Sequence, residues 1–97
     1  MKVHRVVSES GKRNNLQGFC FRCHSPVREG ITAEIVVRAE ENEIIPLALG
    51  VVQKRGPTYF TRHVPLHISC SPPRLGEEVE VLRGFLVAKK IGGGFLI

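Results

Sequence analysis

The stretch GFCFRCHSP (residues 18–26) contains two cysteines separated by two residues, Cys20 and Cys23. A second pair of metal-binding side-chain types, His67 and Cys70, lies far downstream at the same spacing. A structural zinc ion takes four tetrahedral ligands from Cys sulfur and His nitrogen, usually as two close pairs from distant parts of a chain. These four side chains are therefore predicted to bind one zinc ion that joins two knuckles.

The choice of histidine depends on Pro65, which lies between the two histidines of HVPLHISC (63–70). Proline removes a helical hydrogen-bond donor and biases the preceding residue toward an extended conformation. In an extended segment His63 and His67 would lie roughly 13 Å apart, so the two cannot bind the same ion. We predict His67 as the ligand, and His63 and His4 remain fallback ligands.

His24 follows Cys23 directly, and because neighbouring side chains usually diverge we expect it outside the ligand set. Two other interpretations of Cys20-x-x-Cys23 stay open. The spacing can arise by chance in a chain with four histidines. The pair can also be redox-active, but thioredoxin-like chemistry requires a helix N-terminus in a βαβ unit, and no such unit is predicted.

Length and composition predict one folded, intracellular domain. A chain of 97 residues buries only roughly 60–70% of its unfolded surface, so a cross-link would matter to its stability. No apolar run approaches the roughly 18 residues of a membrane span, and the N-terminus lacks the apolar core of a secretory signal. We therefore predict a single zinc-binding domain over residues 1–97, cytoplasmic or nuclear, without membrane contact.

Period-two alternation and β-branched residues predict a mainly β fold, in which a single zinc site closes an antiparallel meander. We expect a short strand over 2–7. The three strands of the meander are predicted over 31–40, 43–54 and 58–69. Pro46 cannot donate a ladder hydrogen bond, so it predicts an edge or a bulge in the second of these strands.

The segment 77–90 can be interpreted in two ways. Val79, Leu82 and Leu86 fall at helical spacing. Gly84, however, would cost about 1 kcal/mol in a helix interior, and the valines of this segment favour a strand. We therefore predict a strand pair around Gly84, followed by a return of the final residues.

The stretch CFRCHSPVREGITAEIVVRA, followed by HISC, resembles the CxxC…HxxC arrangement of poly(ADP-ribose) polymerase-type zinc fingers and, more loosely, LIM half-sites. In the former family a CxxC knuckle leads into a strand, and HxxC follows an antiparallel sheet. The resemblance covers residues 19–70. It implies a zinc-binding module whose four ligands are Cys20, Cys23, His67 and Cys70.

Positive charge is concentrated in the two blocks that contain the predicted ligands. The formal net charge is +5. Residues 1–28 contain six Lys or Arg and one acidic residue, and residues 49–75 contain four Lys or Arg and no acidic residue. The block between them, 29–48, is acidic. Such basic blocks favour an anionic partner, and nucleic acid is the main candidate.

We predict that basic loops and neighbouring aromatic rings bind nucleic acid, with DNA and RNA both open. Lys and Arg contact phosphates, and Tyr59 can stack on an unpaired base for about 1–3 kcal/mol. Taken singly, Phe19, Phe21 and Phe60 are each expected in the core instead. The predicted contact residues are Lys12, Arg13, Arg22, Lys54, Arg55, Tyr59 and Arg62.

Catalysis is not predicted, because four protein ligands leave zinc no open position and the chain has no Asp and no phosphate-binding loop. The alternative function is a protein-interaction module, or a small regulator or inhibitor of a larger nucleic-acid enzyme, with purely structural zinc. Edge strands or the apolar end 95–97 would bind a partner or a second copy. The acidic residues that motivate this alternative are Glu34, Glu40, Glu41 and Glu43.

Overall fold

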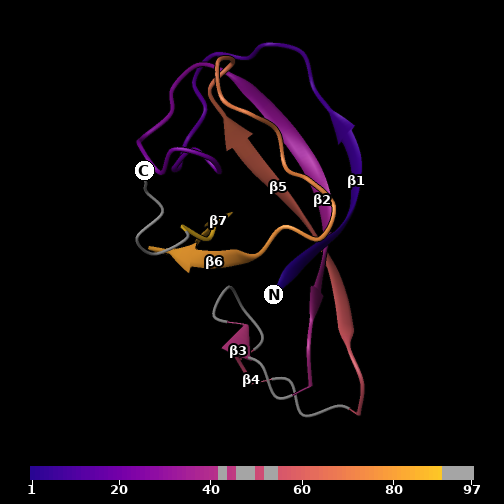
Figure 1. Ribbon diagram of the computed structural model, residues 1–97. Coiled ribbons are helices and arrows are strands. Elements are labelled where there is room, and N and C mark those ends of the chain that lie inside the picture. The colour runs from indigo at the N-terminus through magenta and orange to yellow at the C-terminus, as the bar shows by residue number, and fades with distance from the viewer. Residues whose placement is uncertain (42–43, 46–49, 52–54, 91–97) are drawn as a thin grey trace, which may run out of the picture.

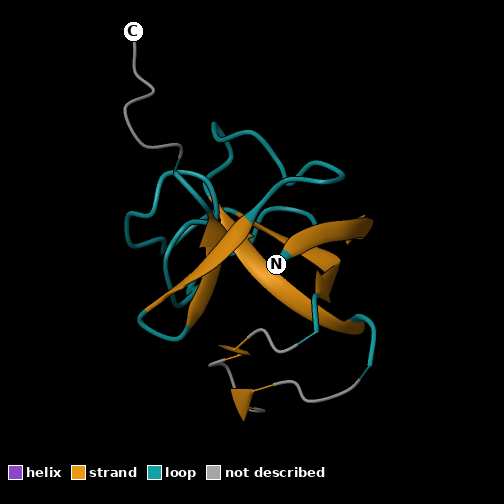
Figure 2. Cartoon of the chain, turned by 60° about the horizontal axis from the view of Figure 1, so that its bottom comes forward, coloured by secondary structure: helices purple, strands orange, loops and turns teal. Residues whose placement is uncertain are grey.

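A computed structural model of the chain describes residues 1–41, 44–45, 50–51 and 55–90. Only strands and loops occur in this part of the chain (Figure 2), which confirms the mainly β prediction. None of the described segments is a helix long and apolar enough to cross a membrane. The strands are β1 (Lys2–Glu9), β2 (Ile31–Ala39), β3 (Ile44–Ile45), β4 (Gly50–Val51), β5 (Thr58–Leu66), β6 (Val79–Leu82) and β7 (Phe85–Ala88) (Figure 1).

The main sheet is antiparallel, and β2 is its central strand between β1 and β5. Strand β2 pairs with β5 over its whole length, from Ile31 opposite Leu66 to Ala39 opposite Thr58. From Ala33 to Ala39 the odd-numbered residues of β2 are buried and the even-numbered ones are half-buried. Because successive side chains of a strand point to opposite faces, β2 has one core face and one outer face.

One part of the predicted meander is wrong: the described residues of the segment 43–54 do not lie between 31–40 and 58–69. Its described residues form a separate two-stranded ribbon, β3 with β4, beyond the end of the main sheet (Figure 1). The physical reason is that β2 pairs with β5 along its full length and with β1 on its other edge, so β2 has no free edge for a further strand. The edge or bulge predicted at Pro46 lies outside the described residues.

Strands β6 and β7 form a hairpin around Arg83 and Gly84. Both residues have positive φ values, 49° and 87°, which is the geometry of the type I′ turn that suits two-residue hairpin loops. The strand pair predicted within 77–90 is therefore confirmed, and the helical alternative is wrong. The return predicted for the final residues lies outside the described part of the chain.

Backbone hydrogen bonds outside the strand ladders link the main sheet to the β6–β7 hairpin. The amide of Phe21 donates to the carbonyl of Pro65 in β5 (2.9 Å), and the amide of Ala88 in β7 donates to the carbonyl of Phe21 (2.8 Å). On the opposite side, the amide of Val3 in β1 donates to the carbonyl of Glu77, just before β6 (2.8 Å). Phe21, which lies between the predicted ligands Cys20 and Cys23, thus connects β5 to β7 through its backbone.

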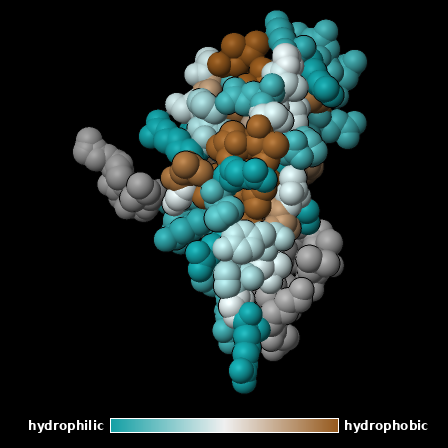
Figure 3. All heavy atoms as spheres, turned by 90° about the vertical axis from the view of Figure 1, so that its right-hand side faces the viewer, coloured by the Kyte–Doolittle hydropathy of each residue, from teal (hydrophilic) through white to brown (hydrophobic). Residues whose placement is uncertain are grey.

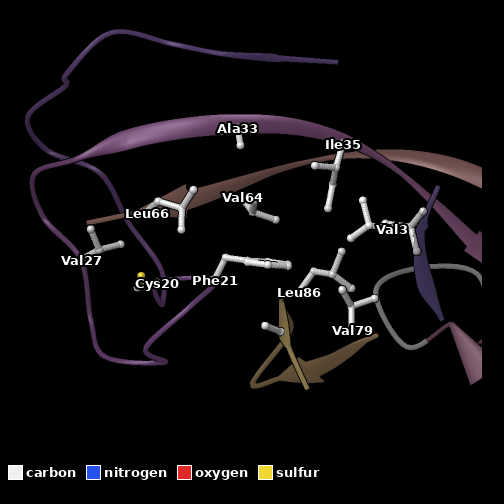
Figure 4. Close-up of a cluster of buried hydrophobic side chains, with 12 residues drawn as sticks. Val3, Cys20, Phe21, Val27, Ala33, Ile35, Val64, Leu66, Val79 and Leu86 are labelled. Carbon is white, nitrogen blue, oxygen red and sulfur yellow. The ribbon is translucent and has the colours of Figure 1, made fainter. Parts of the chain in front are cut away.

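The hydrophobic core lies between the main sheet and the β6–β7 hairpin. Figure 4 shows the ring of Phe21 between Val64 on one side and Leu86 on the other. Phe21 is fully buried, and burial of a Phe side chain contributes roughly 1.5–3 kcal/mol. Cys20 lies at one end of the same cluster, near Val27 (Figure 4). The core therefore extends to the first predicted metal ligand.

Candidate metal centre

The four predicted ligands meet at one point. The ligand atoms of Cys20, Cys23, His67 and Cys70 all lie within 4.8 Å of one another. The Sγ of Cys23 is 3.2 Å from the Nδ1 of His67. Tetrahedral zinc, with Zn–S of about 2.3 Å and Zn–N of about 2.0–2.1 Å, separates its ligand atoms by roughly 3.5–3.8 Å. The donor set and its dimensions therefore fit a bound metal ion.

The first knuckle is a tight hairpin formed by residues 19–26, whose end residues form an antiparallel bridge. The amide of Cys20 donates to the carbonyl of Ser25 (2.8 Å), and the amide of His24 donates to the carbonyl of Cys20 (3.0 Å). His24 has a φ of 66°, a left-handed conformation that residues other than glycine adopt infrequently. This turn lets the side chains of Cys20 and Cys23 converge on one side of the hairpin.

The other three histidines have different neighbours. The Nε2 of His24 lies 2.6 Å from the carbonyl oxygen of Ala88, so His24 ties the knuckle to β7 from outside the ligand set, as predicted. The Nε2 of His63 is 3.9 Å from a carboxylate oxygen of Glu34. His4 makes a ring contact on the outer face of the main sheet. Among the described residues, His67 is the one histidine that joins the three sulfurs.

The second knuckle follows the end of β5. The amide of Cys70 donates to the carbonyl of His67 (3.0 Å), and the amide of His67 donates to the Sγ of Cys20 (3.5 Å). The backbone of Gly30 packs closely against the residue that precedes His67: a Cβ at Gly30 would lie 1.9 Å from the carbonyl oxygen of Leu66. No larger side chain fits there unless the backbone that carries His67 moves.

The cysteine pKa values reflect how closely the sulfurs are packed. Burial acts to raise the pKa of Cys23, but hydrogen bonds from the Ser25 amide, Cys20 and His67 lower it to about 6. Burial, together with the neighbouring Cys20 and Cys23 groups, raises the pKa of Cys70 to about 11. Crowded thiolates repel one another, and a divalent cation removes that repulsion. The electrostatics of the site therefore favour a metal ion.

Arg22 has a structural role that the sequence interpretation missed. Its Nε donates to the carbonyl of Ser71 (3.1 Å), and its Nη2 donates to the carbonyl of Pro72 (2.9 Å). The guanidinium also forms a two-pronged ion pair with Glu77, in which Nη2 donates to Oε1 (2.9 Å) and Nη1 contacts Oε2. Arg22 thus clamps the first knuckle to the chain that follows the second.

The ion pair between Arg22 and Glu77 shifts the pKa of both residues. Burial acts to raise the pKa of Glu77, but the hydrogen bond from Arg22 and the amide of Arg74 lower it. The same ion pair raises the pKa of Arg22. The carboxylate and two carbonyls accept four hydrogen bonds from Arg22, which leaves one of its five N–H donors for a phosphate. The acidic partner is 55 positions away in the chain, so no local pattern indicates the pair.

The remaining predicted contact residues do not form one patch. Lys12 and Arg13 are exposed at the metal end, where Arg13 and Gly30 exchange backbone hydrogen bonds (2.6 and 3.0 Å). Arg55 is exposed near the far end of β2 and β5, and a nine-residue strand spans roughly 30 Å. Lys54 lies outside the described residues.

Tyr59 and Arg62 are three residues apart on β5, so they lie on opposite faces of the sheet. Tyr59 is 46% exposed on the outer face. Arg62 is half-buried on the core side, with its guanidinium carbon 4.9 Å from the ring centroid of Phe60. Phe21 is fully buried in the core and the half-buried Phe60 packs against it, so the core expectation is confirmed for these two. Phe19 is half-buried and contacts the ring of Phe85 instead.

Comparisons of the chain with protein-family models, with curated proteins and with solved structures give no match. The resemblance to poly(ADP-ribose) polymerase-type and LIM modules therefore stays a prediction based on the quoted residues. The proposed function therefore rests on the four converging side chains and on the exposed basic residues.

Proposed function

We propose that this chain is a non-catalytic domain that binds one structural zinc ion and binds nucleic acid through its basic surface. The observation that carries the metal assignment is the convergence of three sulfurs and one ring nitrogen, from Cys20, Cys23, His67 and Cys70. Thiolate with imidazole is the donor set of structural zinc sites. When bound, zinc supplies a cross-link between the two knuckles, and its four protein ligands leave no position for a substrate.

Zinc binding is expected to dominate the stability of the domain. Structural zinc contributes roughly 10–16 kcal/mol in finger peptides, whereas domains have a net stability of about 5–15 kcal/mol. We expect elemental analysis to find one zinc per chain, and Cys20→Ser or Cys70→Ser to lower both metal content and Tm. Ser69→Ala, an exposed position within the second knuckle, is the control. A metal-free wild-type protein of unchanged stability would contradict the assignment.

The loop at the metal end supports phosphate binding. Lys12, Arg13 and Arg28 are exposed there. Arg28, which the sequence interpretation did not single out, lines a shallow hollow of about 360 Å³ together with Asn15 and Gln17. Lys, Arg and side-chain amides are the groups that most often contact phosphate oxygens. The loop thus combines cationic groups with hydrogen-bond donors on one surface.

The protein-interaction alternative has less support, because the described acidic residues that motivated it have partners within the chain. Glu43 and the apolar end 95–97 lie outside the described residues. The partners are the Ser8 hydroxyl for Glu34 (3.4 Å), Arg38 for Glu40 (2.7 Å) and the amide of Gly56 for Glu41 (3.2 Å).

Binding to labelled oligonucleotides across a salt series tests the nucleic-acid proposal. We expect affinity to fall steeply with salt, with a log–log slope that loses about 0.7–0.9 for each phosphate contact removed. Lys12→Ala with Arg13→Ala should therefore weaken binding and flatten the slope. Lys89→Ala with Lys90→Ala removes equal charge at another exposed site and should change binding less. Negligible binding at low salt would refute the proposal.

A further inference from the structure

We infer that the outer face of the β1–β2–β5 sheet binds single-stranded nucleic acid, with the ring of Tyr59 stacked on a base. The inference rests on the proposed function, because it names the form of nucleic acid and the surface that recognises it. It adds a specific contact to the phosphate contacts of the loop at the metal end.

The two faces of this sheet differ sharply in exposure. On the core face Ala33, Ile35 and Val37 are each fully buried. On the outer face Tyr59 is 46% exposed and the side chain of His63 is 66% exposed. Figure 3, which shows the molecule from the right-hand side of Figure 1, presents a mixed surface in which hydrophilic residues surround an apolar patch near the middle of the view. The outer face is therefore accessible to a ligand.

A β-bulge brings a second aromatic ring beside Tyr59. The register between β1 and β2 shifts between Val3 and Arg5, and a bulge of this kind redirects the side chain at its centre. That residue is His4, whose ring lies 4.6 Å from the ring of Tyr59, centroid to centroid, at 71°. In this perpendicular arrangement His4 covers at most one face of Tyr59. The ring contact restrains Tyr59, whose exposed fraction of 46% is the surface that a base would contact.

Cationic side chains lie beside the ring pair. Arg38 is directly opposite Tyr59 in the β2–β5 ladder, and Lys2 is opposite Arg38 in the β1–β2 ladder. Arg5, opposite Val36, is exposed on the same face. Glu40 pairs with Arg38, which offsets part of the charge, so Lys2 and Arg5 are the stronger candidates for phosphate contacts.

The polar surface continues along the sheet toward the metal end. Arg13, Ser8, Thr32 and His63 line a shallow hollow of about 240 Å³. Two acidic residues also line it: Glu9, and Glu34, which accepts a hydrogen bond from Ser8 and faces His63. Hydroxyl, imidazole and guanidinium groups thus connect the basic loop with the ring pair, and the phosphate contacts are expected at Lys2, Arg5 and the basic loop rather than beside these carboxylates.

Stacking on Tyr59 selects unpaired bases. The base faces within a duplex are covered by neighbouring bases, whereas an unpaired base offers a free π-face to an aromatic side chain. The phosphate contacts alone do not favour the single strand, since a duplex has the higher charge density. The ring pair therefore predicts a preference for single strands.

Intrinsic fluorescence tests this prediction directly, because Tyr59 is the only tyrosine and the chain has no tryptophan. The zinc-loaded full chain is titrated with an oligothymidylate, an abasic strand of the same length and a duplex of the same length. We expect the oligothymidylate to quench the fluorescence of Tyr59, whereas the abasic strand and the duplex bind with little quenching. Free tyrosine amide, titrated in parallel, corrects for light absorbed by the bases.

Substitutions separate the two proposals. Tyr59→Leu should weaken oligothymidylate binding by roughly 5- to 150-fold, the equivalent of one lost stacking contact. Tyr59→Phe keeps the ring and should stay within about twofold, and Leu75→Ala, at a position that is 72% exposed, is the surface control. Equal, unquenched binding of all three ligands, with Tyr59→Leu unchanged, would overturn this inference alone. If the wild-type protein binds none of the three ligands, the proposed function itself is refuted.

Discussion

The two knuckles have the same ligand spacing, but they differ in how far their side chains are buried in the core. The second position of the first knuckle is Phe21, which is fully buried in the core. The second position of the other knuckle is Ile68, which is 59% exposed. The fold itself therefore positions the first knuckle, whereas the second projects from the end of β5.

Their hydrogen bonds show the same difference. The backbone of Phe21 bonds to both β5 and β7, whereas the amide of Cys70 donates to His67 within its own knuckle. A metal ion that joins the two would transfer rigidity from the core to the projecting turn. Equal ligand spacing in a sequence thus does not imply equal structural support.

The largest expected difference comes from truncating the second position of each knuckle. Phe21→Ala removes a fully buried ring and should lower the free energy of unfolding by about 3–5 kcal/mol. Ile68→Ala removes an exposed side chain and should change it by less than about 0.5 kcal/mol. Denaturant unfolding of the zinc-loaded proteins measures both, with Phe21→Leu as a milder variant. Similar effects at the two positions would mean that the knuckles are equally anchored.

An intermediate effect is expected at the glycine behind the second knuckle. Gly30→Ala forces a Cβ against the carbonyl of Leu66, and overpacking of this kind costs about 1–3 kcal/mol. Because His67 follows Leu66, zinc affinity should fall as well. Gly11→Ala, where nothing lies within 4 Å of the added Cβ, is the matched control. Competition with a chelator measures affinity, and unchanged zinc affinity in Gly30→Ala would show that the turn adapts freely.

The smallest effect concerns the clamp between Arg22 and Glu77. The pKa of Glu77 is lower in the folded protein than its unfolded value of about 4.3. The carboxylate of Glu77 therefore stabilises the fold at pH values above the unfolded pKa. This contribution is lost as the pH falls through the folded pKa. Glu77→Gln should therefore destabilise the protein by about 1 kcal/mol at pH 7, and the difference should shrink below about pH 4.

The matched control for the clamp is Glu78→Gln, because Glu78 contacts the exposed Lys89 at 3.8 Å, and such surface pairs contribute little. Unfolding curves of the three proteins across pH measure the effect. A Glu77→Gln difference that stays constant down to low pH would show that the ion pair does not stabilise the link between the knuckles.

Local chemistry in the sequence was sufficient to predict which four side chains converge at the candidate metal centre and where β1, β2 and β5 lie. Pro65 forces an extended chain, so the choice of His67 over His63 depends on only a few neighbouring residues. The same holds for β2, where alternation alone separates the core face from the outer face. Alternation along β5 also separates Tyr59 from Arg62, although the predicted contact set combined them.

The features that the sequence did not predict depend on distant partners. The pairing of β2 with β5 leaves β3 and β4, the described residues of the segment 43–54, outside the main sheet. The role of Arg22 depends on Glu77, far along the chain. The position of Phe21 between β5 and β7 likewise follows from closure of the whole fold, so its buried character alone predicts core but not its connecting role.

The position of Phe21 between β5 and β7 also has a kinetic consequence. Contacts between segments far apart in sequence form slowly, because loop closure costs entropy before those contacts stabilise the chain. The first knuckle is a local hairpin, so it can form early and offer Cys20 and Cys23 to a metal ion while the chain is still open. Once the core closes, Cys20 is fully buried. If the four side chains bind a metal ion, access to Cys20 would therefore be easier before the core closes than after it.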